Sequence, residues 1–170
     1  YTITTKVKPE LISFDVQLNY PPHTHKKPDI LFNNGNLNIP EYTQISWTIS
    51  CNDTDSVQIT IGDHSSVRAT YLADIQSYNV NYTAITSNPY EIFLNNQYGH
   101  NQESIRYKMT VLKDLFPELE VNFFVDTLYY EFILITGTLS DDYGIHSLMV
   151  DQKGGSDSLI ILPVKDIPNS

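Results

Sequence analysis

The chain has 170 residues, 41% of them hydrophobic and 18% charged, a composition typical of a folded globular protein rather than a disordered one. Twenty acidic and ten basic side chains give a net charge of −10, so we expect neither nucleic acid nor an anionic membrane surface as a partner. Cys51 is the only cysteine, which excludes an internal disulfide and a Cys-x-x-Cys zinc or redox centre. We expect no cofactor.

Short segments with an apolar residue at every second position follow one another through the first two thirds of the chain. The segment 11–20 alternates through Ile12, Phe14, Val16 and Leu18, and the segment 43–50 through Ile45, Trp47 and Ile49. The same period of two recurs at 57–61, 67–71, 78–82, 90–94 and 105–111. Each segment predicts a β-strand with one buried face. Only residues 72–78 are compatible with a single helical turn.

Turn-forming sequences separate these predicted strands. They include "NNGN" at 33–36, "CNDTDS" at 51–56, "GDHSS" at 62–66, "TSNP" at 86–89 and "NNQYGHNQ" at 95–102. Short strands at this spacing predict an all-β fold, an antiparallel β-sandwich of immunoglobulin or fibronectin III type, with Trp47 in its core.

The pattern restarts after residue 112. "PEL" at 9–11 recurs at 117–119, and "WTISCNDTDSVQI" at 47–59 is similar to "ITGTLSDDYGIHSL" at 135–148, which indicates an internal repeat of about 108 residues. We predict one sandwich in residues 1–113 and the first strands of a second, truncated immunoglobulin-like domain in residues 114–170. Half a sandwich exposes an apolar face and open strand edges, so we expect the second part to pair with a neighbouring copy or with the first domain.

The beginning of the chain predicts an origin within a longer protein. Tyr1 opens the sequence without a Met, inside the alternating segment "YTITTKV". The longest nearly uncharged apolar stretch, at 132–137, is far shorter than the roughly 20 residues that span a bilayer. We therefore expect an excised segment that makes no direct membrane contact.

Two adjacent carboxylates, Asp141 and Asp142, are the first candidate metal site. Calcium would need six to eight oxygens, roughly, and Asp151 and Asp157 are further candidate ligands. No D-x-D-x-D-G loop is present, however, and an Asp at the end of a strand commonly accepts backbone N–H groups in an Asx-turn. We favour a structural turn over a calcium site.

A pair of histidines, His23 and His25 in "PPHTHKKPD", is the second candidate metal site. In an extended segment both side chains would lie on the same side, but the sequence offers no evident third ligand. Three prolines and two lysines favour a solvent loop. His64, His100 and His146 are isolated and no nucleophile motif accompanies them, so we predict a protein that is not an enzyme.

Twelve tyrosines raise the alternative of a carbohydrate-binding module, because an exposed aromatic strip can bind sugar rings. Five of them fall in step with aliphatic core positions: Tyr71, Tyr78, Tyr82, Tyr90 and Tyr107. We therefore predict that they fill the core.

Three segments taken in order, "VKPELISFDVQLNYPPHT", "GNLNIPEYTQISWTI" and "SDDYGIHSLMV", resemble a bacterial family of unknown function. Its members are long proteins with hydrophobic N-terminal helices, tandem immunoglobulin-like domains and a coiled-coil-rich remainder. Tyr20-Pro21 fits the family pattern. Tyr42 stands where glycine is usual, which predicts that this turn does not need a glycine-only conformation. The resemblance implies a membrane-anchored parent with this part in the periplasm or at the cell surface.

These observations favour a non-catalytic immunoglobulin-like module of a larger bacterial envelope protein. It would serve as a spacer or as a protein-interaction domain, with another protein or neighbouring domains of the parent chain as its partner. The alternatives are a carbohydrate-binding module and a calcium-dependent adhesion domain.

Overall fold

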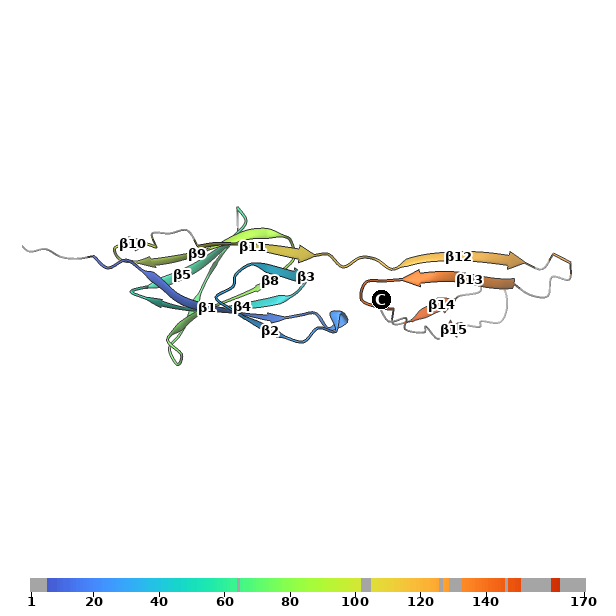
Figure 1. The fold of residues 1–170 in the computed structure, drawn as a ribbon, viewed down its shortest axis with the longest axis horizontal. Coiled ribbons are helices and arrows are strands. Elements are labelled where there is room, and N and C mark those ends of the chain that lie inside the picture. Colours follow the sequence, from blue (N-terminus) through green and yellow to red (C-terminus); the bar gives the residue numbers. More distant parts are fainter. Residues whose placement is uncertain are drawn as a thin grey trace, which may run out of the picture. The chain divides into compact units, whose positions relative to one another are not determined.

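The computed structural model describes residues 6–63, 65–101, 105–125, 127–128, 133–145, 147–150 and 160–162 (Figure 1). The chain divides into two compact units, Tyr1–Lys113 and Asp114–Ser170.

The first unit is a sandwich of two β-sheets. One sheet contains β1 (Glu10–Asn19), β2 (Asp29–Phe32), β4 (Gln44–Asn52), β7 (Thr70–Leu72) and β8 (Ser77–Thr83), in the order β2-β1-β4-β8-β7. The other contains β3 (Leu37–Pro40), β5 (Ser56–Ile61), β6 (Ser65–Arg68), β9 (Asn88–Asn96) and β11 (Ile105–Leu112), in the order β3-β11-β9-β5-β6, and β10 (Gly99–His100) pairs with β9. The pairing of β3 with β11 is parallel and the others are antiparallel. The predicted all-β, antiparallel sandwich architecture is confirmed.

The core lies between the two sheets and is formed by the predicted alternating residues. Trp47 on β4 is fully buried, and its ring lies 5.3 Å from that of Tyr90 on β9 of the opposite sheet. Trp47 Nε1 donates a hydrogen bond to Tyr90 Oη (3.3 Å), and Tyr90 Oη donates to the carbonyl of Gly35 (2.6 Å). Burial raises the pKa of Tyr90. A polar pair in the middle of the core therefore joins the two sheets without an unpaired group.

Two strands depart from the predicted alternation. The register of β1 against β4 shifts between Leu11 and Ser13, so Ile12 is exposed although Phe14 and the inward residues after it are buried. The predicted strand 67–71 is two strands, because β6 and β7 belong to different sheets and the chain crosses between them at Ala69.

Residues 21–42, where the sequence shows no alternation, contain two strands that were not predicted. β2 and β3 are four-residue strands, too short for a period to show, and β3 ends on Pro40. Residues 72–78, whose sequence is compatible with a single helical turn, contain no helix; residues 73–76 form a turn that leads into β8. A 3-10 helix lies instead at Pro22–Thr24, where Pro21 and Pro22 fix the backbone angle φ and Thr24 Oγ1 donates to the Pro21 carbonyl (2.8 Å).

The turn before β4 contains a residue in the left-handed conformation, which residues other than glycine also adopt in this chain. Tyr42 has φ of +63°, the left-handed conformation that favours glycine. Its N–H donates to the Ala84 carbonyl (2.7 Å), and Thr43 Oγ1 donates to the Pro40 carbonyl (2.7 Å). These hydrogen bonds hold the turn in a conformation that the tyrosine side chain itself disfavours.

The described residues of the second unit form two antiparallel strand pairs. β12 (Glu118–Val125) pairs with β13 (Ile133–Ser140), and β14 (Leu148–Val150) pairs with β15 (Ile160–Leu162), both antiparallel. The β12–β13 hairpin begins like the β1–β4 pair: Glu118 lies opposite Ser140 as Glu10 lies opposite Asn52.

Candidate functional site

Three loops meet at one end of the sandwich of the first unit, here called the loop end: residues 53–55, 73–76 and 97–98. They follow β4, precede β8 and follow β9, and the strand pairs Ile49–Tyr78 and Ser56–Asn95 bring them to the same end. Loops at the end of a rigid sandwich are where such folds commonly carry recognition residues.

Hydrogen bonds fix the loops of this end to one another. Asn96 Nδ2 donates to the carbonyls of Val7 (3.0 Å) and Asp53 (2.7 Å). The N–H of Gln97 donates to the Asp55 carboxylate (3.0 Å), and the N–H of Asp55 donates to the Asn95 carbonyl (2.8 Å). The loop after β4 and the loop after β9 therefore form one preorganised surface.

Two tyrosines are exposed on this end. Tyr98 is 47% exposed, and Tyr71 on β7 is 53% exposed. The Tyr71 ring packs on Tyr78 with ring centroids 5.0 Å apart, and Tyr78 Oη donates to the Thr54 carbonyl (2.8 Å). Tyr78 thus anchors both the Tyr71 ring and the loop after β4.

A cavity of about 470 Å³ lies beside Tyr71, here called the Tyr71 cavity. Its wall includes the end of β4 with Cys51, the loop residues Asn52 and Asp53, and Gln76 before β8. The volume is within the range of small-molecule sites, roughly 300–1,000 Å³. Asp53 and Gln76 both have positive φ, 49° and 50°, so each sits in a sharply turned backbone.

Burial raises the pKa values of two groups in the wall of this cavity. The Cys51 thiol is partly buried, and a hydrogen bond with Thr54 opposes only part of the effect of burial on its pKa. The pKa of Tyr78 is raised mainly by burial and further by the neighbouring Cys51, Tyr71 and Asp55. Both groups are therefore neutral near pH 7.

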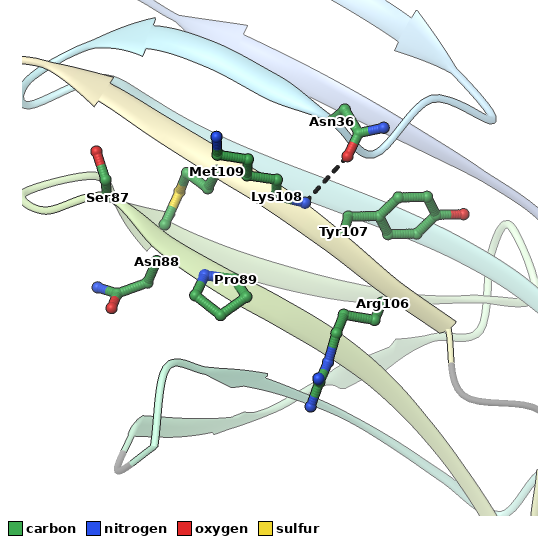
Figure 2. Close-up of a pocket in the computed structure, with 8 residues that line it drawn as sticks. All are labelled: Asn36, Ser87, Asn88, Pro89, Arg106, Tyr107, Lys108 and Met109. Carbon is green, nitrogen blue, oxygen red and sulfur yellow. Dashed lines mark hydrogen bonds between the residues drawn. The ribbon is translucent and has the colours of Figure 1, made fainter.

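A second cavity, about 530 Å³, lies beside the first half of β11, and Figure 2 shows the residues that line it. Asn36 Oδ1 accepts the backbone N–H of Lys108 (3.0 Å), and Arg106 forms an ion pair with Glu91 (3.4 Å). Ser87 Oγ accepts a hydrogen bond from the N–H of Val111 and donates one to its carbonyl. These polar groups are therefore already occupied by hydrogen bonds and an ion pair within the sheet.

The two histidines do not form the arrangement considered from the sequence. His23 lies in the 3-10 helix and His25 follows it with φ of +53°, so the segment is not extended and the premise of two ligands on one side is wrong. Both side chains are exposed. Among the residues that the structure describes, no group of three or more His, Cys, Asp or Glu is placed to hold a metal ion.

Asp141 and Asp142 follow the end of β13. Asp141 Oδ2 accepts the backbone N–H of Tyr143 (3.2 Å), the contact of an Asx-turn. Asp151 and Asp157, the other calcium candidates, lie outside the described residues, as do His64 and His146.

The five tyrosines in step with the core differ in burial. Tyr78 and Tyr90 are buried, and Tyr82 and Tyr107 are partly buried against the core. Tyr71 contradicts the prediction of core filling, because β7 is an edge strand and leaves one side of its ring open. The sequence "NNQYGHNQ" predicted a turn but did not indicate that Asn96 would donate hydrogen bonds to Val7 and Asp53.

Comparison of the chain with protein-family models, with curated proteins and with solved structures finds no match. Within the described part of the chain, no helix is long and apolar enough to cross a membrane.

Proposed function

We propose that the first unit is a non-catalytic, immunoglobulin-like protein-interaction domain of a larger bacterial envelope protein. The observation that carries this proposal is the direction in which the first and last strands, β1 and β11, run through the sandwich. β1 starts beside the loop end, where Glu10 pairs with Asn52, whereas β11 runs from the loop end toward the opposite end, where Met109 pairs with Asn88 (Figure 1). A domain that the chain enters and leaves at opposite ends suits a serial array and leaves its loops and edges available.

The strand order supports the immunoglobulin-like assignment. If β1, β4, β8 and β7 take the places of strands A, B, E and D, then β5, β9 and β11 take those of C, F and G. Trp47 and Tyr90 then occupy strands B and F, the strands that a disulfide joins in antibody domains. A hydrogen-bonded aromatic pair would replace the covalent link.

An exposed apolar face in the second unit supports a position next to other domains. One face of the β12–β13 hairpin carries Leu119, Val121, Phe123 and Ile135, each exposed or partly exposed. An apolar face of this kind favours contact with a neighbouring domain of the parent chain or with another copy. The family resemblance alone implies the location that we propose, in the periplasm or at the cell surface in a membrane-anchored parent.

Site-specific photocross-linking in the bacterium that makes the parent protein tests this function. The photoreactive residue is placed at Tyr98 on the loop end, at Phe32 on the exposed edge strand β2, and at the exposed Ser66 on β6 as a control. We expect one discrete protein adduct from position 98 or 32 and none from position 66. If neither position 98 nor position 32 gives an adduct, the result would contradict protein binding, and the domain would then be a spacer.

A further inference from the structure

The Tyr71 cavity combines an aromatic ring face with polar side chains that have no hydrogen-bond partner among the described residues. The side chains of Asn52, Asp53 and Gln76 make no hydrogen bond to another described residue. The Thr54 hydroxyl, by contrast, donates a hydrogen bond to the Asn52 carbonyl (2.8 Å). Two amides and a carboxylate therefore offer both donors and acceptors beside an exposed ring.

The position of the Tyr71 ring is fixed rather than free to collapse into the cavity. Its packing on Tyr78, which is itself held by the Thr54 carbonyl, leaves about half of its surface toward solvent. The ring face is electron-rich, and the C–H groups on one face of a pyranose are complementary to it, while hydroxyls at the rim of the sugar suit amide and carboxylate partners.

The charge of the cavity restricts the class of ligand. None of the described residues that line it is Lys or Arg, and Asp53 in its wall carries a carboxylate. A phosphate, a sulfate or an acidic sugar would be repelled.

We propose that the Tyr71 cavity binds a neutral pyranose unit of a glycan, with Tyr71 as the stacking platform and Asn52, Asp53 and Gln76 as the groups that bind its hydroxyls. This goes beyond the protein-interaction function and does not depend on it. In the cavity beside β11, by contrast, Ser87 and Asn36 accept hydrogen bonds from backbone N–H groups of β11.

Cys51 supplies a direct readout of occupancy. It is the only cysteine of the chain and lies in the wall of the cavity, so a maleimide reagent reports on this place alone. A sugar in the cavity would slow the reaction. Because burial raises the thiol pKa, the rate is best followed at mildly alkaline pH.

The experiment uses the full chain with cellotriose, maltotriose, mannotriose and chitotriose, each titrated by calorimetry and by protection of Cys51. We expect at least one trisaccharide to bind and to slow the modification of Cys51. Tyr71→Ala should weaken that binding about tenfold or more, and Tyr71→Phe should retain it because the ring face remains. Tyr98→Ala is the matched control, an exposed tyrosine of the same end outside the cavity wall, and should bind like the wild type.

A second variant separates lost binding from lost folding. Gln76 has positive φ, so Gln76→Gly relieves backbone strain while removing one amide, and should unfold no more easily than the wild type yet bind more weakly. Binding by none of the four trisaccharides, protection of Cys51 that persists in Tyr71→Ala, or equal losses in Tyr71→Ala and Tyr98→Ala would overturn the proposal.

Discussion

The β1–β4 pair of the first unit and the β12–β13 pair of the second unit are built alike but have opposite burial. Val16 faces Trp47 in the first pair, and Phe123 faces Ile135 in the second, so the aromatic residue has changed strands. Phe14 is 3% exposed, whereas Phe123 is 69% exposed. Strand pairing therefore does not by itself bury an apolar face, because burial requires a second sheet, which β3, β5, β9 and β11 provide in the first unit.

The two units also differ in net charge. The second unit has ten acidic and two basic side chains, a net charge of −8 out of −10 for the whole chain. Two such units would repel each other at low ionic strength, which favours a neutral or basic neighbour over a second copy for the apolar face of the β12–β13 hairpin.

The largest expected difference comes from truncating the two phenylalanines. Phe14→Ala should lower the free energy of unfolding of the first unit by about 3–5 kcal/mol, because it leaves a cavity in a closed core. Phe123→Ala should change the stability of the chain by less than about 0.5 kcal/mol, because the side chain is already in water. Denaturant unfolding followed by far-ultraviolet circular dichroism measures both. A large loss in Phe123→Ala would show that the hairpin face is covered in solution.

Gly137 tests whether the hairpin pairing of the second unit depends on close backbone approach. A Cβ at this position would overlap the backbone carbonyl oxygen of Glu120 on the paired strand. Gly137→Ala should weaken the hairpin by about 2 kcal/mol, seen as faster hydrogen exchange of the amides of β12, with the first unit unchanged. Thr136→Ala, next to it and on the opposite face of β13, is the control. Unchanged exchange in Gly137→Ala would contradict the register.

Tyr90→Phe tests the polar link between the sheets of the first unit. Loss of the hydroxyl leaves Trp47 Nε1 without its acceptor and the Gly35 carbonyl without its donor, which should cost about 1.5 kcal/mol. The same denaturant experiment measures it. Tyr98→Phe, an exposed position, should change stability by no more than a few tenths of a kcal/mol, roughly. A neutral result for Tyr90→Phe would indicate that water replaces the hydroxyl.

The smallest expected effect is an alkaline loss of stability in the first unit. Burial raises the pKa of Tyr90 above its ordinary value of about 10. The stabilising contribution of the neutral Tyr90 hydroxyl to the folded state is therefore complete below about pH 10. It falls as the pH rises above this value, because the unfolded chain then releases the phenolic proton while the folded chain retains it. We expect the free energy of unfolding to decline between about pH 10 and 11, and less steeply in Tyr90→Phe. Equal slopes would contradict this assignment. Burial also raises the pKa values of Tyr78 and Tyr107, so part of the slope should remain.

The period-two alternation was sufficient to predict the longer strands and the inward position of Trp47. Alternation of this kind reflects the geometry of a single strand and needs no knowledge of its neighbours. The short strands β2 and β3, the bulge at Ile12 and the sheet change at Ala69 left no such pattern.

The sequence by itself determined that the chain forms β-strands with one apolar face, since side-chain chemistry and local periodicity are enough for that. Only the tertiary structure decided which of those faces are covered. It also decided that Tyr71 stays at an edge beside Asn52, Asp53 and Gln76, residues that lie in two separate segments of the chain. The physical reason is that a strand's partners in the sheet, and the sheet packed against it, are non-local contacts that no local pattern encodes.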